Sequence, residues 1–281
     1  MPATDLAPPL LWPAEAIWQA VEPLLHGFSV EVLPELPSTN TELMRRARLG
    51  RADAVLLVAE RQTAGRGRLG RHWSSHGANA QGPGQAAHAT ASLTFSLGLA
   101  LAPQDWSGLS LAVGLAVAQS LHPDVGLKWP NDLWFDGRKL GGILIETAAV
   151  GALRYAVIGI GLNIELPAAQ DLRTPPAALR ELLSATDAAQ ALGCVALPLV
   201  QTVLRFVSEG FAPLGSAFHA RDVLYGHAVE CTDGTLGQAR GVDASGALLV
   251  HTASGLKKIS SAEVSVRTPP KAPSSNTDAP V

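Results

Sequence analysis

The alternation of hydrophobic and polar positions predicts that helices and strands succeed one another along the first 220 residues. Residues 92–99 alternate strictly, with a leucine or phenylalanine at every odd position, which is typical of a strand with one buried face. Residues 109–121 are apolar but too short to span a bilayer, so we expect a buried helix there. This succession favours a mixed α/β (α+β) domain around one main sheet. We further expect helices at 14–25, 38–49, 177–191 and 197–210, and strands at 54–60, up to Trp129, at 142–147 and at 154–162.

The pattern changes near residue 222, where short β-like stretches replace the longer elements. Asp-Gly or Ser-Gly pairs at 233–234, 245–246 and 254–255 separate several of these stretches and are typical of tight turns. Short strands in such close succession favour a small barrel. The five expected strands are 227–232, 236–243, 247–252, 256–260 and 264–267. We expect four segments: an N-terminal extension (1–30), a main domain (31–220), the barrel (221–267) and a disordered tail (268–281), with a flexible loop at 77–91.

Composition and charge place the chain among ordinary globular proteins. It is 47% hydrophobic and 16% charged, and its formal net charge of −3 does not favour a dedicated nucleic-acid binder. Cys194 and Cys231 match no metal or redox spacing, and we expect two buried thiols in a reducing compartment. The N-terminus shows no signal-peptide pattern. We therefore expect a cytoplasmic protein without a membrane span.

The first candidate for chemistry is a glycine loop with four arginines between residues 61 and 71. Residues 65–71 match the letters of the G-x-G-x-x-G dinucleotide fingerprint but not its context, because no apolar helix follows. No acidic residue occurs between Glu60 and Asp105 to bind a ribose, and no Gly-Lys-Ser/Thr follows that would make a P-loop. The arginines instead supply forked donors for carboxylate or phosphate. A solvated basic loop, or a single-strand nucleic-acid loop with Trp73 as a stacking platform, stays open.

The second candidate is a pair of lysines in a chain that otherwise uses arginine. Before residue 257 the only lysines are Lys128 and Lys139. Lys128 begins the sequence Lys-Trp-Pro-Asn-Asp, and Asp136-Gly137 predicts a hairpin that would bring both lysines to one site. A compact ammonium suits an anionic ligand. A plain turn after a strand, or a chance pair of surface lysines, is the alternative.

Glycine pairs and a helix start are the remaining candidates. The glycines at 141–142 open an apolar strand, and Gly159 and Gly161 alternate with branched residues, which puts both on one face as a flat floor. Plain strand packing is the alternative for each. Residues 38–40 read Ser-Thr-Asn, and the Thr-x-x-Glu pattern that begins at Thr39 predicts a capping box. The free N–H groups of such a helix start suit a polar ligand head.

Taken in order, these segments resemble the biotin–protein ligase family over residues 33–267, in the form that lacks an N-terminal DNA-binding domain. The resemblance implies a catalytic domain with a central mixed sheet flanked by helices, similar to class II aminoacyl-tRNA synthetases, and an SH3-like C-terminal barrel. It rests on residues 38–40, on 62–68 with Trp73, on 128–132, on 139–144 and on 159–163. It implies that biotin and MgATP give biotinyl-AMP, and that a lysine of a biotin carboxyl carrier domain then takes the biotinyl group.

The resemblance also implies roles for residues. The catalytic residues would be Lys139, Arg66, Arg68, Lys128 and Asp132. Biotin would contact Ser38, Thr39, Asn40, Gln62, Arg66, Gly67, Arg68, Lys139, Gly142, Leu144 and Gly159. ATP and the adenylate would contact Arg66, Arg68, Arg71, Trp73, Lys128, Asn131 and Asn163. Metal ligands are not implied.

The partners expected from the resemblance are ATP, Mg²⁺, biotin and a carboxylase carrier domain, with a possible homodimer. Because residues 1–30 leave no room for a DNA-binding domain, no operator binding is expected. Two alternatives remain. A lipoate–protein ligase would share the fold and reaction plan but not the pocket, and a non-catalytic protein would bind biotin or single-stranded nucleic acid without turnover.

Overall fold

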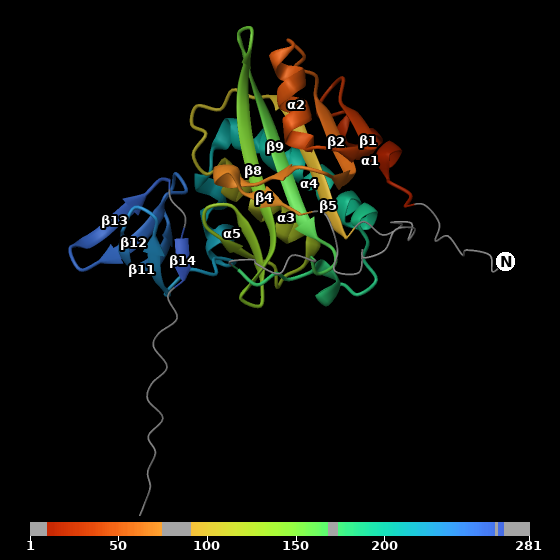
Figure 1. The fold of residues 1–281 in the computed structure, drawn as a ribbon. Coiled ribbons are helices and arrows are strands. Elements are labelled where there is room, and N and C mark those ends of the chain that lie inside the picture. Colours follow the sequence, from red (N-terminus) through yellow and green to blue (C-terminus); the bar gives the residue numbers. More distant parts are fainter. Residues whose placement is uncertain (1–9, 75–90, 168–173, 262–263, 267–281) are drawn as a thin grey trace, which may run out of the picture.

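A seven-stranded mixed sheet covered by helices, followed by a smaller C-terminal sheet, makes up the computed structural model (Figure 1). The structure describes residues 10–74, 91–167, 174–261 and 264–266. The large sheet has the order β1-β2-β5-β9-β8-β7-β6, in which β1 and β2 run parallel and every other neighbouring pair runs antiparallel. Its strands are β1 (Ser29–Leu36), β2 (Val55–Gln62), β5 (Ser92–Ala100), β6 (Gly126–Lys128), β7 (Asp132–Phe135), β8 (Arg138–Val150) and β9 (Leu153–Asn163). The predicted mixed α/β domain with one main sheet is confirmed.

Helices cover both faces of this sheet. One face carries α1 (Ala14–Val21), α3 (Leu109–Leu121) and α4 (Ala188–Glu209), whose buried side chains share one hydrophobic core with β5 and β9. The other face carries α2 (Thr39–Arg48), which packs in a second, smaller core against Tyr155 and Val157. A short helix, α5 (Gly215–His219), leads toward the C-terminal sheet.

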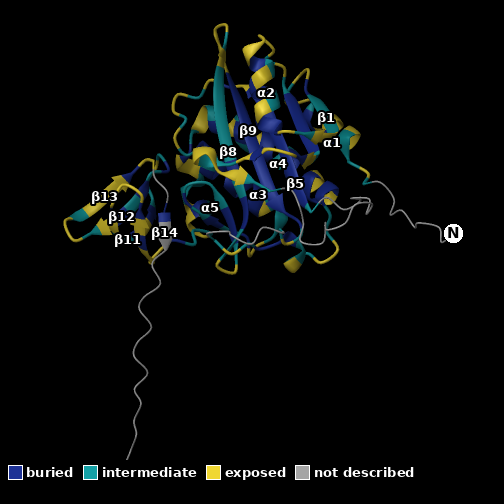
Figure 2. Ribbon diagram, viewed as in Figure 1, coloured by how far each residue is buried: buried dark blue, intermediate teal, exposed yellow. Residues whose placement is uncertain are grey.

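The covered faces explain the sequence of β5. Its leucines and phenylalanine, as predicted, pack in the core with α3 and α4. The alternate residues Ser92, Thr94 and Ser96 lie on the α2 side and are also buried, so the strand carries a polar face that water does not reach (Figure 2). Buried polar groups need hydrogen-bond partners. This polar face therefore marks the place where α2 and the sheet enclose a site.

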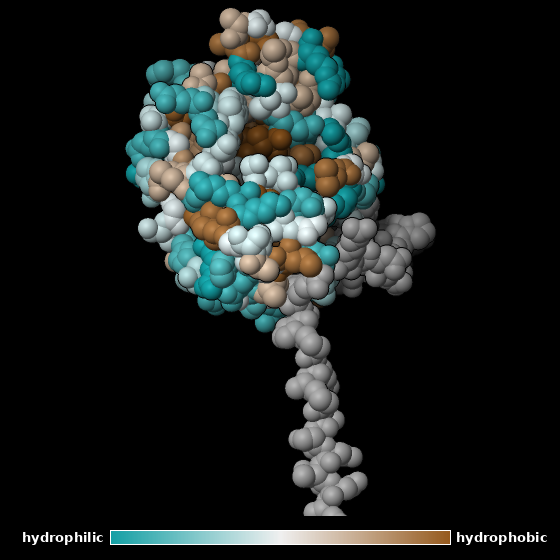
Figure 3. Space-filling model, turned by 90° about the vertical axis from the view of Figure 1, so that its left-hand side faces the viewer, coloured by the Kyte–Doolittle hydropathy of each residue, from teal (hydrophilic) through white to brown (hydrophobic). Residues whose placement is uncertain are grey.

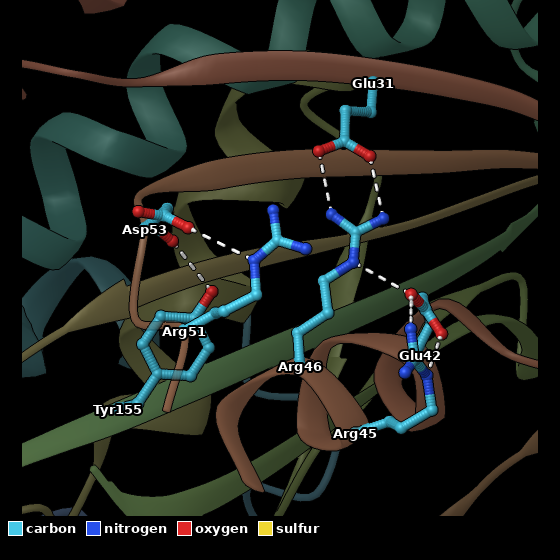
Figure 4. Close-up of polar contacts among 7 residues, drawn as sticks. All are labelled: Glu31, Glu42, Arg45, Arg46, Arg51, Asp53 and Tyr155. Carbon is cyan, nitrogen blue, oxygen red and sulfur yellow. Dashed lines mark hydrogen bonds and ion pairs between the residues drawn. The ribbon is translucent and has the colours of Figure 1, made fainter. Parts of the chain in front are cut away.

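Ion pairs fix α2 to the sheet from its exposed side (Figure 4). Arg46 donates both guanidinium ends to Glu31 of β1 at 2.7 and 2.8 Å, and it also pairs with Glu42 one turn earlier. The hydrogen bond from Arg45 is the largest cause that lowers the pKa of Glu42 to about 2. On the buried side the Tyr155 hydroxyl donates to the carbonyl of Asp53. The Arg46–Glu31 ion pair therefore ties the last turn of α2 to the edge strand β1.

The predicted boundaries of the helices after residue 177 were wrong. The expected helices at 177–191 and 197–210 are a 3₁₀ turn (Leu179–Glu181) and one long helix, α4, which continues through Pro198. Pro198 removes one backbone hydrogen bond, but the freed carbonyl belongs to the exposed residue Cys194, where water can donate to it instead. Cys194 itself was expected to be buried and is exposed, while Cys231 is buried as predicted. Strand β1 was not predicted at all.

Helix α4 is also long and apolar enough, by length and composition, to cross a membrane. In the structure it packs against α1, α3 and β5, and its apolar face from Ala188 to Phe206 is buried in the core. Apolar core helices of globular proteins satisfy the same length criterion. The helix is therefore accounted for by core packing.

The C-terminal sheet is antiparallel and contains the five strands that the turn pattern predicts. Its order is β13-β12-β11-β10-β14, and within the described residues no pairing joins β13 to β14, so the sheet is open. The indole of Trp129, which is 3% exposed, donates to the carbonyl of Gly246 at 3.0 Å and joins this sheet to the main domain. The strands are β10 (Ala228–Cys231), β11 (Leu236–Val242), β12 (Leu248–Thr252), β13 (Gly255–Ile259) and β14 (Val264–Val266).

The predicted loop at 77–91 and tail at 268–281 fall on or extend into residues outside the described ranges.

On the face of the molecule that carries the C-terminal sheet, hydrophobic side chains form separate small patches among hydrophilic ones (Figure 3).

Candidate active site

A pocket of about 550 Å³ lies between the start of α2, the glycine loop, and the pocket-facing sides of β7, β8 and β9. Every residue that the sequence predicts for the site lines it. Two further lining residues, Thr232 and Val264, come from the C-terminal sheet. The pocket thus collects residues that are more than 200 positions apart in the chain.

One end of the pocket, which we call the helix-start end, consists of Ser38, Thr39, Asn40, Gln62 and Ser96. All five are 6% exposed or less. The Thr39 backbone N–H donates to Gln62 Oε1 at 2.7 Å, and the Thr39 hydroxyl lies 3.2 Å from the same oxygen. Ser96 Oγ lies 2.7 Å from both Thr39 Oγ1 and Asn40 Oδ1. This end is a connected network of neutral side chains, formed without a ligand.

Asn40 is held in one orientation within the helix-start end. Its amide nitrogen donates to the Leu144 carbonyl at 3.1 Å and to Glu146 Oε2 at 3.0 Å. A Cβ atom at residue 159 would overlap the Asn40 amide, so only glycine fits there. An added Cβ at Gly161 would overlap the ring of Trp73, so protein side chains pack directly on both glycines of β9.

The opposite end, the cationic end, contains Arg68, Arg71, Lys128 and Lys139 with Asn131 and Asp132. The predicted hairpin at Asp136-Gly137 is confirmed, with φ values of 49° and 69°, and it brings Lys128 and Lys139 to the same pocket. Lys139 Nζ donates to Asp132 Oδ1 at 2.7 Å, so this lysine is paired before a ligand binds.

Lys128 and Arg68 differ from Lys139, because no carboxylate among the described residues lies within ion-pair distance of either. The Lys128 ammonium lies 4.4 Å from the ring centroid of Trp134, and burial lowers its pKa. The Arg68 guanidinium donates to Asn131 Oδ1 at 3.2 Å, and burial lowers its pKa as well. Both are desolvated cations that an anionic ligand would stabilise.

Arg66 lies beside the helix-start end and is already paired. Its guanidinium lies 3.1 Å from Glu146 Oε1 and 3.3 Å from Glu146 Oε2. Asn163, at the end of β9, donates to the carbonyls of Lys139 and Ala177 at 3.3 and 3.0 Å, which fixes the wall beside the cationic end. Among the predicted cations, Arg66 and Lys139 therefore form ion pairs with carboxylates, whereas Lys128 and Arg68 form none among the described residues.

The predicted capping box was misplaced by one residue. Ser38, not Thr39, is the N-cap of α2, and its hydroxyl accepts from the Thr41 N–H at 3.4 Å. Glu42 does not close a capping box, because it pairs with Arg45 and Arg46 instead. Thr39 is thereby free to bond Gln62 within the pocket wall.

Sequence reasoning also missed residues of the site. Ser96 is the buried centre of the helix-start network, and Glu146 joins Asn40 to Arg66, yet neither was given a role. The signal for Ser96 was present in the Ser-x-Thr-x-Ser alternation of β5, which was interpreted only for its apolar face. Glu146 carried no comparable signal, since its two partners lie 106 and 80 positions away in the chain.

Within the described residues no group of three or more His, Cys, Asp or Glu side chains is placed to hold a metal ion. Magnesium usually binds proteins through one or two carboxylates together with substrate phosphates and water.

Two parts of the chain match known families. Residues 32–163 match the biotin/lipoate A/B protein ligase family, and residues 228–267 match the biotin protein ligase C-terminal domain. The biotin–(acetyl-CoA-carboxylase) ligase of Paracoccus denitrificans is 32% identical over 247 residues, which cover 83% of this chain and 98% of the relative.

Other relatives show the same likeness over different lengths. The Mycobacterium tuberculosis enzyme of that name is 42% identical over 146 residues, 48% of this chain and 49% of the relative. The bifunctional ligase/repressor BirA of Escherichia coli is 34% identical over 259 residues, 88% of this chain and 77% of the relative. Among solved structures, the biotin protein ligase of Aquifex aeolicus in complex with biotin and ATP has a TM-score of 0.67 at 26% identity, covering 85% and 98% of the two chains.

Proposed function

The chain belongs to the biotin–(acetyl-CoA-carboxylase) ligase family, and we infer from this premise that it is an ATP-dependent biotin–protein ligase. It joins biotin to AMP and then transfers the biotinyl group to a lysine of a biotin carboxyl carrier domain. The observation that supports this most directly is the division of one pocket into a neutral, hydrogen-bonding end and a cationic end. Biotin has a matching division, because its ureido ring is neutral and its carboxylate is charged.

In the first step a biotin carboxylate oxygen attacks the α-phosphorus of ATP, a P–O bond to pyrophosphate breaks, and the mixed anhydride biotinyl-AMP forms. Two anions must approach each other for this step, and their repulsion opposes it. We propose that Lys128 and Arg68 offset that repulsion, because they are desolvated cations that form no ion pair with a carboxylate among the described residues, and Asp132 acts on both only at longer range. Mg²⁺ would come bound to the phosphates of ATP.

The helix-start end would hold the ureido ring. Ser38, Thr39, Asn40 and Gln62 present donors and acceptors in fixed orientations, and Gly159 leaves room for the Asn40 amide to lie against β9. Gly142 and Leu144 would contact the apolar part of biotin. Trp73, Asn131, Asn163 and Arg71 would contact the adenylate, because they line the cationic end and its wall. Gly67 would lie over the ligand in the glycine loop.

In the second step the carrier lysine attacks the acyl carbonyl, a C–N bond forms, AMP leaves and the amine loses a proton. We propose that Asp132 orients or deprotonates this amine. Lys139 Nζ donates to Asp132 Oδ1 at 2.7 Å, which fixes the position of this carboxylate. Replacement Asp132→Asn should slow transfer by roughly 100-fold and adenylate formation much less. Single-turnover measurements with preformed biotinyl-AMP check this, and equal loss in both steps would contradict the role.

The remaining expectations are proposals that follow from the same premise. We propose that the chain is divided into residues 1–30, 31–220, 221–267 and 268–281. We also propose an SH3-like C-terminal barrel, a catalytic domain similar to class II aminoacyl-tRNA synthetases, a cytoplasmic location and a homodimer. We propose no operator binding by this chain, in keeping with its formal net charge of −3. Titration with duplex DNA at physiological salt checks that proposal, and nanomolar binding would contradict it.

The first experiment measures pyrophosphate release by purified protein with MgATP and biotin, with lipoate in place of biotin as the control. The expected result is about one equivalent of pyrophosphate per enzyme with biotin in the absence of an acceptor, and none with lipoate. Release with lipoate alone would assign the chain to the lipoate branch of the matched family. No release with either acid would leave a binding protein without turnover.

A further inference from the structure

Glu146, on the pocket-facing side of β8, contacts both walls of the pocket without lining it. One partner is Asn40 at the start of α2, and the other is Arg66 in the glycine loop. We propose that Glu146 is a positioning residue that ties the glycine loop to the helix-start end, so that one carboxylate orders both. This inference rests on the proposed function only for its effect on biotin, because the contacts exist in the protein without a ligand.

The first half of the argument concerns the orientation of Asn40. An asparagine amide can present either its oxygen or its nitrogen to a neighbour. An ionised carboxylate only accepts, so Glu146 Oε2 requires the amide nitrogen at 3.0 Å and leaves Asn40 Oδ1 turned toward Ser96. The carbonyl of Leu144 imposes the same choice at 3.1 Å. Glu146 thereby helps to decide which polar atom of Asn40 the pocket contains.

The second half concerns the glycine loop. The loop is a narrow hairpin in which β3 (Gly65–Arg66) pairs with β4 (His72–Trp73). Arg66 anchors this hairpin to the other wall through both oxygens of Glu146 and through a weak contact with Thr41 Oγ1 at 3.5 Å. The tip keeps a separate bond from Arg68 to Asn131. Loss of the Glu146 carboxylate should therefore loosen the base of the hairpin while its tip contact remains.

Two substitutions at Glu146 separate these effects. In Glu146→Gln the side-chain oxygen can still accept from Asn40, but the ion pair with Arg66 is lost. In Glu146→Ala both contacts are lost. The matched control is Glu209→Gln, which removes an ion pair with Arg205 at 2.7 Å on α4, away from the pocket lining. Glu146 has a side-chain exposure of 22%, so either replacement can be solvated without a buried cavity.

Limited trypsin digestion of the ligand-free protein measures how well ordered the glycine loop is, through the rate at which it is cleaved. No lysine or arginine occurs between Arg71 and Lys128, so mass spectrometry assigns cuts at Arg66, Arg68 and Arg71 without ambiguity. A partly exposed ion pair is worth up to about 1 kcal/mol, and we therefore expect cleavage at these arginines to become about fivefold faster in both Glu146 variants. The Glu209→Gln control should cleave at the wild-type rate.

Calorimetric titration with biotin tests the hydrogen bond between Asn40 and Glu146. We expect the Kd to stay within about twofold of wild type in Glu146→Gln and to rise roughly tenfold in Glu146→Ala, because only the second leaves a donor of Asn40 unpaired. Unchanged cleavage in both Glu146 variants, or equal acceleration in Glu209→Gln, would overturn the proposal. Pyrophosphate release by the wild-type protein is measured separately, so a failure of the biotin ligase assignment would not be mistaken for a failure at Glu146.

Discussion

The two ends of the pocket differ in how completely their polar groups are satisfied before a ligand binds. At the helix-start end, Thr39, Asn40, Gln62 and Ser96 bond one another and lie almost fully buried. At the cationic end, Lys128 has an aromatic ring in place of a carboxylate, and Arg68 has only the amide of Asn131 among its described partners.

This difference explains how one site can combine selectivity for a ligand with catalytic turnover. A preformed neutral network recognises a neutral ring by the placement of donors and acceptors, at little cost in reorganisation. Desolvated cations gain most when negative charge develops beside them, as it does during attack on a phosphate. The helix-start end should therefore control which acid binds, and the cationic end should control how fast the adenylate forms. Three substitutions or conditions test this division, and a fourth outside the pocket serves as a reference.

The largest expected effect is at the cationic end. Lys128→Ala removes a desolvated ammonium from the place where two anions meet, and we expect adenylate formation to slow by about 100-fold or more. Because Lys128 would meet only the carboxylate of biotin and is not part of the helix-start network, biotin binding should weaken by no more than several-fold. Rapid-quench measurement of biotinyl-AMP and calorimetry with biotin test the two halves. A matching loss of biotin affinity would mean that the ends are not independent.

The second-largest expected effect is on biotin binding, at the helix-start end. Ser96→Ala leaves the buried Asn40 Oδ1 without its hydroxyl partner, at a cost of about 1–3 kcal/mol in the network that meets biotin. We expect biotin binding to weaken about tenfold while the KM for ATP stays near its wild-type value. Ser92→Ala, on the same buried face but without a hydroxyl partner among the described residues, is the control and should leave both constants unchanged. Loss of ATP affinity in Ser96→Ala would contradict the division.

A smaller effect should appear at alkaline pH. Burial lowers the pKa of the Lys128 ammonium, so this group loses its charge at a lower pH than an ordinary lysine, whereas bound phosphates favour the charged form. We expect kcat/KM for ATP to fall several-fold as the pH rises toward 10.5, the ordinary value for a lysine. Lys128→Arg keeps its charge throughout that range and should flatten the fall, even if its activity is lower. An unchanged alkaline limb in Lys128→Arg would assign the titration to another group.

The smallest expected effect is on the free energy of unfolding. It arises outside the pocket and serves as a reference for the two ends. The hydrogen bond from Arg45 is the largest cause that depresses the folded-state pKa of Glu42 to about 2 from 4.5. Its stabilising contribution is therefore complete above pH 4.5 and is lost as the pH falls toward 2. Glu42→Gln should lower the free energy of unfolding near neutral pH by about 0.5–1 kcal/mol, since the ion pairs are partly solvated. Urea unfolding at neutral and acid pH checks this, and a difference that persists at pH 2 would contradict it.

Much of the fold could be predicted because its signals are local. Strict alternation located β5, and turn pairs located the strands of the C-terminal sheet. The failures came where packing overrode local preference. Pro198 lies inside α4 because the apolar face of that helix continues past it into the core. Strand β1, which contains Pro34, forms at the edge of the sheet beside β2, where a missing N–H is tolerated.

The site was predictable to the extent that residue types carry chemistry. Unusual lysines, clustered arginines and paired glycines all lie around one pocket. Ser96, Glu146 and Trp134 were missed because their importance comes from neighbours that are distant in sequence. Ser96 is buried only because α2 covers that face of the sheet, and Trp134 matters only because the hairpin places it beneath Lys128. No local pattern encodes such relations.

The hydrogen bond from Trp129 to Gly246 bears on how the chain could be divided by protein engineering. Trp129 stands between Lys128 and Pro130, both of which line the pocket, while its indole is fixed by a turn of the C-terminal sheet. Cutting the chain near residue 221 would separate two pieces that look like modules along the sequence. The N-terminal piece would nevertheless lose the buried acceptor for Trp129, as well as Thr232 and Val264 from the pocket wall. A split version would therefore work only as fast as its halves reassemble, which makes this junction a place to install a conditional switch.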